Sequence, residues 1–182
     1  VTHAYNAMRG FTHREPGAVG AALTDDRLMA TVIPDGIHVH PAAVRLLALA
    51  KGSSRVIGVT DSFWCAGLPP GEYPWSDSHI TWDGTVARRP DGRLAGSTLT
   101  MSQALRNLVR FCNLRLPNAA MMLSSNPARA LGFSERGAVE AGCRADLILL
   151  DGSLDVTMTL IGGRVSYASP RHWILGEEWT RL

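Results

Sequence analysis

The chain has 182 residues, of which 46% are apolar and 19% charged, and its formal net charge is +2. This composition is typical of a soluble globular protein. The eighteen basic residues are scattered, and Arg88-Arg89 is the only adjacent pair, so no nucleic-acid partner is expected. The longest apolar runs, at residues 46–50 and 147–150, are too short to cross a bilayer, so no membrane association is expected either.

Cysteine usage gives a second constraint. Cys65, Cys112 and Cys143 are an odd number and form no C-x-x-C pair, which argues against a disulfide scaffold or a structural zinc knuckle. Reduced thiols and a cytoplasmic location are the expectation.

The first third of the chain reads as a β/α unit. Residues 28–33 form an apolar run that predicts a buried strand, ending at a Pro-Asp-Gly turn. A helix is predicted over residues 41–51, with proline at its first position and Gly52 after its end. Residues 55–60 predict a second buried strand. Strand, helix and strand in this order are typical of a parallel sheet.

Residues 67–96 are rich in Gly, Pro, Trp and Asp and predict a loop with one hairpin, its two strands at 80–82 and 85–87. A helix is predicted from about 98 to 112, because four apolar residues fall on one face. A second helix is predicted from Pro117, and a third, short one after Asn126-Pro127, ending at Gly132.

The remaining sequence changes character. Short strands are predicted at residues 137–139, 145–150, 156–161 and 164–167, separated by Gly and Asp turns. They suggest an antiparallel β module that follows the helices. We therefore expect three parts: a partial barrel over residues 1–136, a β-sandwich portion over 137–168, and a tail over 169–182 in which no pattern predicts structure.

Three residues suggest metal-dependent hydrolysis. His38 and Asp61 lie at the carboxyl ends of the two predicted strands, and Val1-Thr2-His3 looks like the end of a third. Catalytic groups of parallel β/α proteins gather at that edge. Imidazole ligands and a carboxylate that moves a proton are what a metal hydrolase needs. Each residue alone has a plainer explanation, such as a surface histidine or a helix-capping aspartate.

Two loops offer contacts to an anionic or polar ligand. Arg14, followed by Glu15-Pro16-Gly17, could bind phosphate oxygens through two parallel hydrogen bonds, or could simply pair with Glu15 in solvent. Leu94, Ala95 and Gly96 precede a predicted helix, and their backbone N–H groups could bind a ligand oxygen or merely begin that helix.

Seven sequence blocks in one order resemble the N-acetylglucosamine-6-phosphate deacetylases of the amidohydrolase superfamily. The resemblance extends from Val1 to about Ala168. The blocks are Thr2-His3-Ala4-Tyr5-Asn6-Ala7-Met8, Arg14-Glu15-Pro16-Gly17, Asp35-Gly36-Ile37-His38-Val39, Val59-Thr60-Asp61, Leu94-Ala95-Gly96-Ser97-Thr98-Leu99-Thr100-Met101, Asn126-Pro127-Ala128-Arg129 and Ala145-Asp146-Leu147.

The resemblance implies an α/β fold, the C-terminal part of a (β/α)8 TIM-type barrel with a small appended β-sandwich. Val1, Thr2 and His3 would form the sixth barrel strand, and the strands before His38 and Asp61 the seventh and eighth. The chain starts at Val1 without an initiator Met, directly in this strand. We therefore expect it to be the back half of a larger metal-dependent hydrolase.

The resemblance also implies residue roles. Asp61 matches the catalytic acid/base, His38 the substrate-binding histidine and His3 a ligand of a divalent metal ion, expected to be zinc. Further substrate contacts would come from Asn6 and Ala7 near the sugar phosphate, and from the loop Leu94, Ala95 and Gly96 along the sugar. Arg14 matches the phosphate-binding arginine, which in this family can reach the site of the partner subunit in a homodimer.

The implied reaction hydrolyses the acetamide of N-acetylglucosamine 6-phosphate to acetate and glucosamine 6-phosphate. The family's other metal ligands, a glutamate and a second histidine, precede the first block, so this chain alone is expected to be inactive. Residues Ser62-Phe63-Trp64-Cys65 are bulkier than the small residues expected after Asp61. They bear on the fit of the substrate's N-acyl group in its pocket.

Two alternatives stay open. A different amidohydrolase, such as a dihydroorotase-like enzyme or a dipeptidase, would share the barrel and the β module but would not need a phosphate-binding arginine. A truncated paralogue kept as a binding module would show no turnover.

Overall fold

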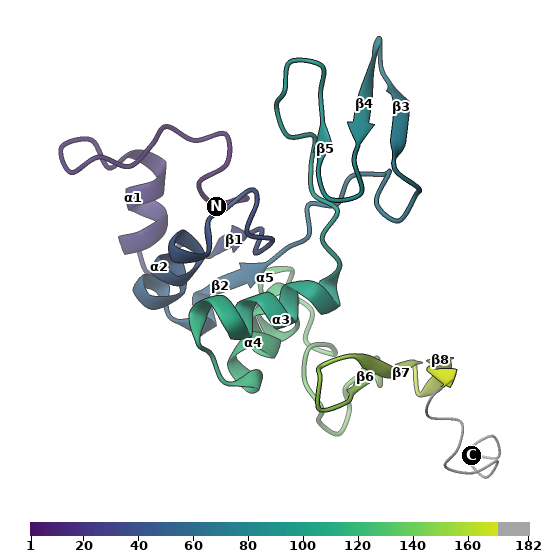
Figure 1. Cartoon of the computed structure of the whole chain (residues 1–182). Helices are drawn as coiled ribbons and strands as arrows, with labels where there is room; N and C mark the ends of the chain where they lie inside the picture. Colours follow the sequence, from purple (N-terminus) through teal and green to yellow (C-terminus); the bar gives the residue numbers. More distant parts are fainter. Residues whose placement is uncertain (171–182) are drawn as a thin grey trace.

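The computed structural model describes residues 1–170, and its centre is a parallel pair of short strands. Strand β1 (Ala30–Val32) pairs with β2 (Val56–Gly58), and Ala30 lies opposite Val56 (Figure 1). Both strands are almost wholly buried, which explains their apolar composition. The expected parallel pair is confirmed, although both strands are shorter than the predicted runs of residues 28–33 and 55–60.

The start of the chain runs beside β1. The Thr31 N–H donates to the Val1 carbonyl at 2.8 Å, and the Ala4 N–H donates to the Thr31 carbonyl at 2.7 Å. No regular strand forms there, because His3 has a φ of 31° and turns the chain away. The segment therefore extends the sheet edge by a few hydrogen bonds.

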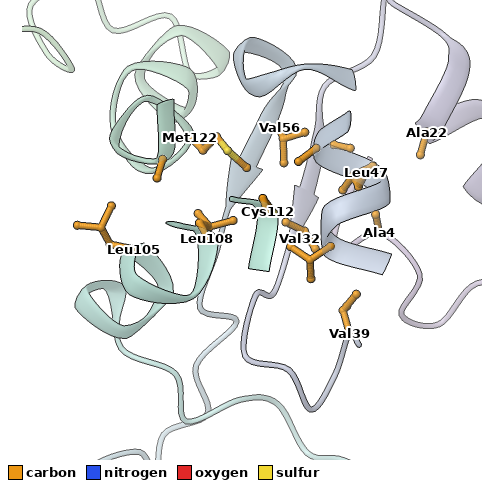
Figure 2. Packing of buried hydrophobic residues seen from close by; sticks show 14 residues of the cluster. Ala4, Ala22, Val32, Val39, Leu47, Val56, Leu105, Leu108, Cys112 and Met122 are labelled. Atoms are coloured by element: carbon orange, nitrogen blue, oxygen red, sulfur yellow. The ribbon is translucent and has the colours of Figure 1, made fainter. Parts of the chain in front are cut away.

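Helices α2 (Pro41–Lys51), α3 (Met101–Cys112) and α4 (Leu116–Leu123) surround this pair. Figure 2 shows Val32 and Val56 of the strands meeting Leu47 of α2, Leu108 of α3 and Met122 of α4. All five side chains are fully buried. Burial of each contributes about 1.5–3 kcal/mol, so this core sets the positions of the strand ends.

The bounds predicted for α2 are confirmed, with proline at the first position and Gly52 after the end. α3 begins three residues later than predicted, because the Thr100 hydroxyl accepts from the Gln103 N–H and caps the helix. Its predicted apolar face is buried except for Met101, which is 45% exposed.

Helix α5 (Ser125–Ala130) contains Pro127 within its first turn rather than beginning after it. A proline fits there because the first N–H groups of a helix have no partner within the helix. Two further elements were not predicted: α1 (Gly17–Thr24), whose glycines and missing side-chain cap gave no helix signal, and the 3-10 turn η1 (Ser53–Arg55) before β2.

A separate antiparallel sheet projects from the core (Figure 1). It consists of β3 (Gly71–Trp75), β4 (Ser78–Trp82) and β5 (Ala87–Arg88) in that order. The hairpin prediction is confirmed in kind, but the prediction of a loop at residues 71–75 was wrong. Pro74 lies on an edge strand, where the missing N–H costs no ladder bond.

The last sheet contains β6 (Leu147–Leu150), β7 (Val156–Ile161) and β8 (Arg164–Ala168), all antiparallel. The strand predicted at residues 137–139 is wrong, because the Gly137 carbonyl accepts from the Ser125 hydroxyl of α5 at 2.5 Å instead of joining a ladder. Arg106 of α3 connects this sheet to the core through Asp155 at 2.7 Å.

Most of the expected tail falls outside the described residues, since only Ser169 and Pro170 belong to them. Within residues 1–170, no helix combines the length and apolar character that a bilayer crossing requires.

A buried asparagine gives a direct test of this architecture. The Asn126 side-chain amide donates to the carbonyls of Ser53 at 2.6 Å and Val56 at 2.7 Å, where β2 begins. Asn126→Ala should lower the free energy of unfolding by about 2–3 kcal/mol, because buried carbonyls lose their donor. Asn118→Ala in α4, which removes no such bond, is the matched control. Urea denaturation of both variants measures the difference, and equal values would contradict the assignment.

Candidate functional site

The turn after β1 holds a buried pair of ionisable side chains. His38 Nδ1 lies 2.6 Å from Asp35 Oδ2, and the two side chains are 8% and 7% exposed. Asp35 Oδ1 also accepts from the backbone N–H groups of Ile37 and His38, both at 2.8 Å. Burial alone would raise the pKa of Asp35, but the hydrogen bonds from His38 and these two N–H groups lower it. Asp35 is therefore held as a carboxylate.

His38 lines a cavity of about 440 Å³ between this turn, the loop before α3 and the first turns of that helix. Gly96, Ser97 and Thr100 form part of its wall, and Asn107 and Arg110 of α3 line it further along. Hydroxyl, amide, guanidinium and imidazole groups thus meet in one hollow, which suits a polar ligand.

Asp61 follows β2 and is exposed. Its backbone carbonyl accepts from the Ser97 N–H at 2.9 Å, and the Ser97 carbonyl accepts from the Phe63 N–H at 2.7 Å. These bonds fasten the loop that precedes α3 directly beside Asp61. Among residues 1–170, no hydrogen bond to the Asp61 carboxylate occurs.

The sequence-predicted loop contributes unequally. Gly96 lies both at the cavity and against Asp61, since a Cβ at position 96 would be 3.2 Å from the Asp61 carbonyl oxygen. Ala95 is buried among the aromatic residues of the β3–β5 sheet, and Leu94 forms a bridge with Arg88; neither lines the cavity.

The residues after Asp61 form an aromatic cluster. The Trp64 ring packs edge-on against Tyr73 with centroids 5.4 Å apart, and Phe63 packs against Trp75 at 6.0 Å. Phe63 is partly buried and lies against Gly96, whereas Trp64 is half-exposed. The bulk that the sequence shows at this point therefore packs against the projecting sheet.

His3 is the candidate metal ligand. Its Nδ1 is buried and has no hydrogen-bond partner among the described residues, which suits a ligand to a missing group. Its backbone N–H donates to the Thr31 hydroxyl at 2.6 Å, which fixes the residue at the sheet edge. Residues 1–170 contain no group of three or more His, Cys, Asp or Glu side chains that could hold a metal ion.

The remaining predicted contacts lie in the first loop, away from the cavity wall. The Asn6 side chain makes only a long bond, 3.4 Å, to the Ala4 carbonyl, and Ala7 is exposed with a φ of 53°. Arg14 is exposed and has no side-chain partner among residues 1–170. The alternative of an Arg14–Glu15 pair is wrong, because Glu15 pairs with Arg9 at 3.2 Å.

Two residues of the site were missed from the sequence. Asp35 could have been found from its position three residues before His38 in the same turn. Asn107 carried no signal, since its buried contact with the Pro34 carbonyl, 2.8 Å long, joins residues 73 positions apart.

A glycine pair tests how tightly the loop is held against Asp61. Gly96 and Gly92 have φ values of +79° and +80°, so alanine is strained at both, but only at position 96 would the Cβ meet other atoms. Gly96→Ala should lower the free energy of unfolding by about 1–2 kcal/mol more than Gly92→Ala, because the added methyl displaces the loop. Chemical denaturation measures this difference, and equal losses would show that the loop is not fixed there.

Comparison with known proteins places this geometry in a family. The amidohydrolase family profile matches residues 2–166. An N-acetylglucosamine-6-phosphate deacetylase of Bacillus subtilis is 41% identical over 93% of this chain and 43% of its own length. A putative N-acetylgalactosamine-6-phosphate deacetylase of Escherichia coli K12 is 41% identical over 90% of this chain and 98% of its own length.

A crystal structure of the N-acetylglucosamine-6-phosphate deacetylase of Thermotoga maritima matches with a TM-score of 0.89 and 38% identity, over 93% of this chain and 47% of that one. The chain thus spans less than half the length of the Bacillus and Thermotoga proteins and nearly all of the Escherichia one. On the extent of the profile match, this chain belongs to the amidohydrolase family.

Proposed function

We propose that this chain carries the proton-transfer and substrate-binding part of an enzyme that hydrolyses the acetamide of N-acetylglucosamine 6-phosphate. One observation carries the proposal: His38 and Asp61 follow two adjacent, parallel strands, and one loop reaches the surroundings of both residues. Gly96 of that loop lines the cavity with His38, while the neighbouring Ser97 N–H binds the Asp61 carbonyl. The relatives named as amino-sugar phosphate deacetylases support the same chemistry.

Asp61 is the acid/base of this proposal. Its exposed carboxylate accepts a proton from the attacking water and then donates it to the departing nitrogen. The C–N bond breaks, the hydroxyl stays on the acyl carbon, and acetate and glucosamine 6-phosphate leave. His38 steadies the substrate or the negative charge that develops on the acyl oxygen during attack.

A divalent metal ion, proposed to be zinc, would polarise the acyl group and activate water when bound. His3 is the proposed ligand from this chain, on the strength of its buried, unpaired Nδ1. Catalytic zinc sites use about three protein ligands. The others would lie outside residues 1–170.

Phosphate recognition is assigned to Arg14, with Asn6 and Ala7 near the sugar phosphate. The loop Leu94, Ala95 and Gly96 would reach the sugar through Gly96, the residue of the three that lines the cavity. Arg14 is exposed and unpaired among the described residues. This is what we expect of an arginine that binds a ligand or reaches the site of another subunit. We therefore also propose a homodimer. A cytoplasmic location is consistent with the three free thiols.

For the fold, we propose that residues 1–3, β1 and β2 correspond to strands six, seven and eight of a (β/α)8 barrel. Residues 1–136 would belong to that barrel and residues 137–168 to a β-sandwich portion. Support comes from the parallel pairing at the core and from the antiparallel sheet β6–β8 that follows it.

The C4 epimer is a second candidate substrate. The Escherichia relative, as similar as the Bacillus one, is named for N-acetylgalactosamine 6-phosphate. Acetate release from each epimer, measured side by side, separates them. A dihydroorotase-like enzyme or dipeptidase would instead act on substrates without phosphate, and a non-catalytic paralogue would release no acetate from either sugar.

The central prediction concerns Asp61. In the metal-loaded protein as the cell makes it, Asp61→Asn should lower kcat for acetate release by about 10³-fold or more, because an amide cannot accept the proton. Asp91→Asn, which alters an exposed loop carboxylate, should retain activity and is the control. An active Asp61→Asn enzyme would remove Asp61 from this role.

Phosphate recognition gives a separate prediction. Arg14→Ala should reduce kcat/KM for N-acetylglucosamine 6-phosphate by about 10- to 100-fold, through loss of charged hydrogen bonds. The unphosphorylated sugar should be affected far less. Arg9→Ala, in the same loop but at an arginine paired with Glu15, is the matched control. Equal losses for both sugars would refute the assignment.

A further inference from the structure

Both oxygens of the Asp35 carboxylate face hydrogen-bond donors. Oδ1 accepts two backbone N–H groups, and Oδ2 lies 2.6 Å from His38 Nδ1. An ionised carboxylate can only accept hydrogen bonds. The hydrogen in the Asp35–His38 contact must therefore belong to Nδ1 of the ring.

This constraint decides which ring nitrogen is available. With the hydrogen on Nδ1, Nε2 carries a lone pair when the ring is neutral and an N–H when it is protonated. Nε2 has no hydrogen-bond partner among residues 1–170, and His38 lines the 440 Å³ cavity. The ring thus offers the same atom to a ligand in both charge states.

The turn that holds Asp35 is itself fixed to α3. The buried Asn107 amide donates to the Pro34 carbonyl at 2.8 Å, and its oxygen accepts from Gln103 at 2.8 Å. Gly36 lies against Phe111, since a Cβ there would be 3.3 Å from that ring. Asp35 is consequently held by the helix as well as by its own turn.

We propose that Asp35 is a positioning residue that keeps the hydrogen of His38 on Nδ1 and so leaves Nε2 as the ring atom that meets the substrate, with Asn107 fixing the turn. The inference rests on the proposed function and adds to it the residue that orients the ring. In the neutral ring Nε2 can then accept a hydrogen bond from the substrate, which a ring with its hydrogen on Nε2 could not do. In serine proteases, the corresponding aspartate-to-asparagine change leaves the wrong tautomer and lowers kcat about 10⁴-fold.

The test is Asp35→Asn. Asparagine keeps an oxygen for the two backbone N–H groups but places an NH₂ against His38 Nδ1, so the ring hydrogen should move to Nε2. Nitrogen-15 NMR of the neutral ring should therefore report Nδ1–H in the wild type and Nε2–H in the variant. In the metal-loaded protein, kcat should fall by about 10²- to 10⁴-fold while KM changes only a few-fold.

Asp83→Asn is the matched control. Asp83 accepts two backbone N–H groups, from Thr85 and Val86 at 2.7 Å, but contacts no histidine. This variant should leave the His38 tautomer and kcat unchanged.

Two results would overturn the inference: Nε2–H in the neutral ring of the wild type, or an Asp35→Asn variant with unchanged kcat. The NMR measurement needs no substrate. Absence of acetate release by a wild type whose His38 carries Nδ1–H would instead count against the proposed function, and the two failures are distinguishable.

Discussion

The parallel pairing of β1 with β2 is the constraint on which the rest of the structure depends. Hydrogen bonds align Ala30 with Val56, so the chain leaves both strands at the same edge of the sheet. His38 and Asp61 follow these exits. The pairing persists because helices bury both strands, and a slip of one residue would turn each side chain to the other face of the pair and disrupt the core packing. Site geometry is thus a consequence of core packing.

Helix α3 serves this arrangement twice. Leu105 and Leu108 close the core over the strands, while Asn107, on the same buried part of the helix, binds the Pro34 carbonyl. A buried amide without a partner would cost about 1–3 kcal/mol, so the turn and the helix are energetically tied. The loop that enters α3 carries Gly96 and Ser97 to Asp61. One helix and the loop that enters it therefore fix the surroundings of both His38 and Asp61.

The projecting sheet shows where local patterns were insufficient. A strand at residues 71–75 was not expected, because its Gly and Pro are typical of loops; pairing with β4 and packing of Tyr73 and Trp75 override that preference. The strand expected at residues 137–139 fails for the opposite reason. Its backbone bonds to α5, a contact that no local pattern encodes.

The sequence by itself determined the β/α order, the bounds of α2, the residues on the apolar face of α3, and the candidates His3, His38 and Asp61. These features depend on periodicity and on residues within a few positions of one another. Only the tertiary structure decided that Glu15 pairs with Arg9, that Gly96 rather than Leu94 lines the cavity, and that Asp35 contacts His38 while Asn107 binds the Pro34 carbonyl. Such contacts depend on how the elements pack, since side chains that are distant in sequence meet only when the core brings their backbones together.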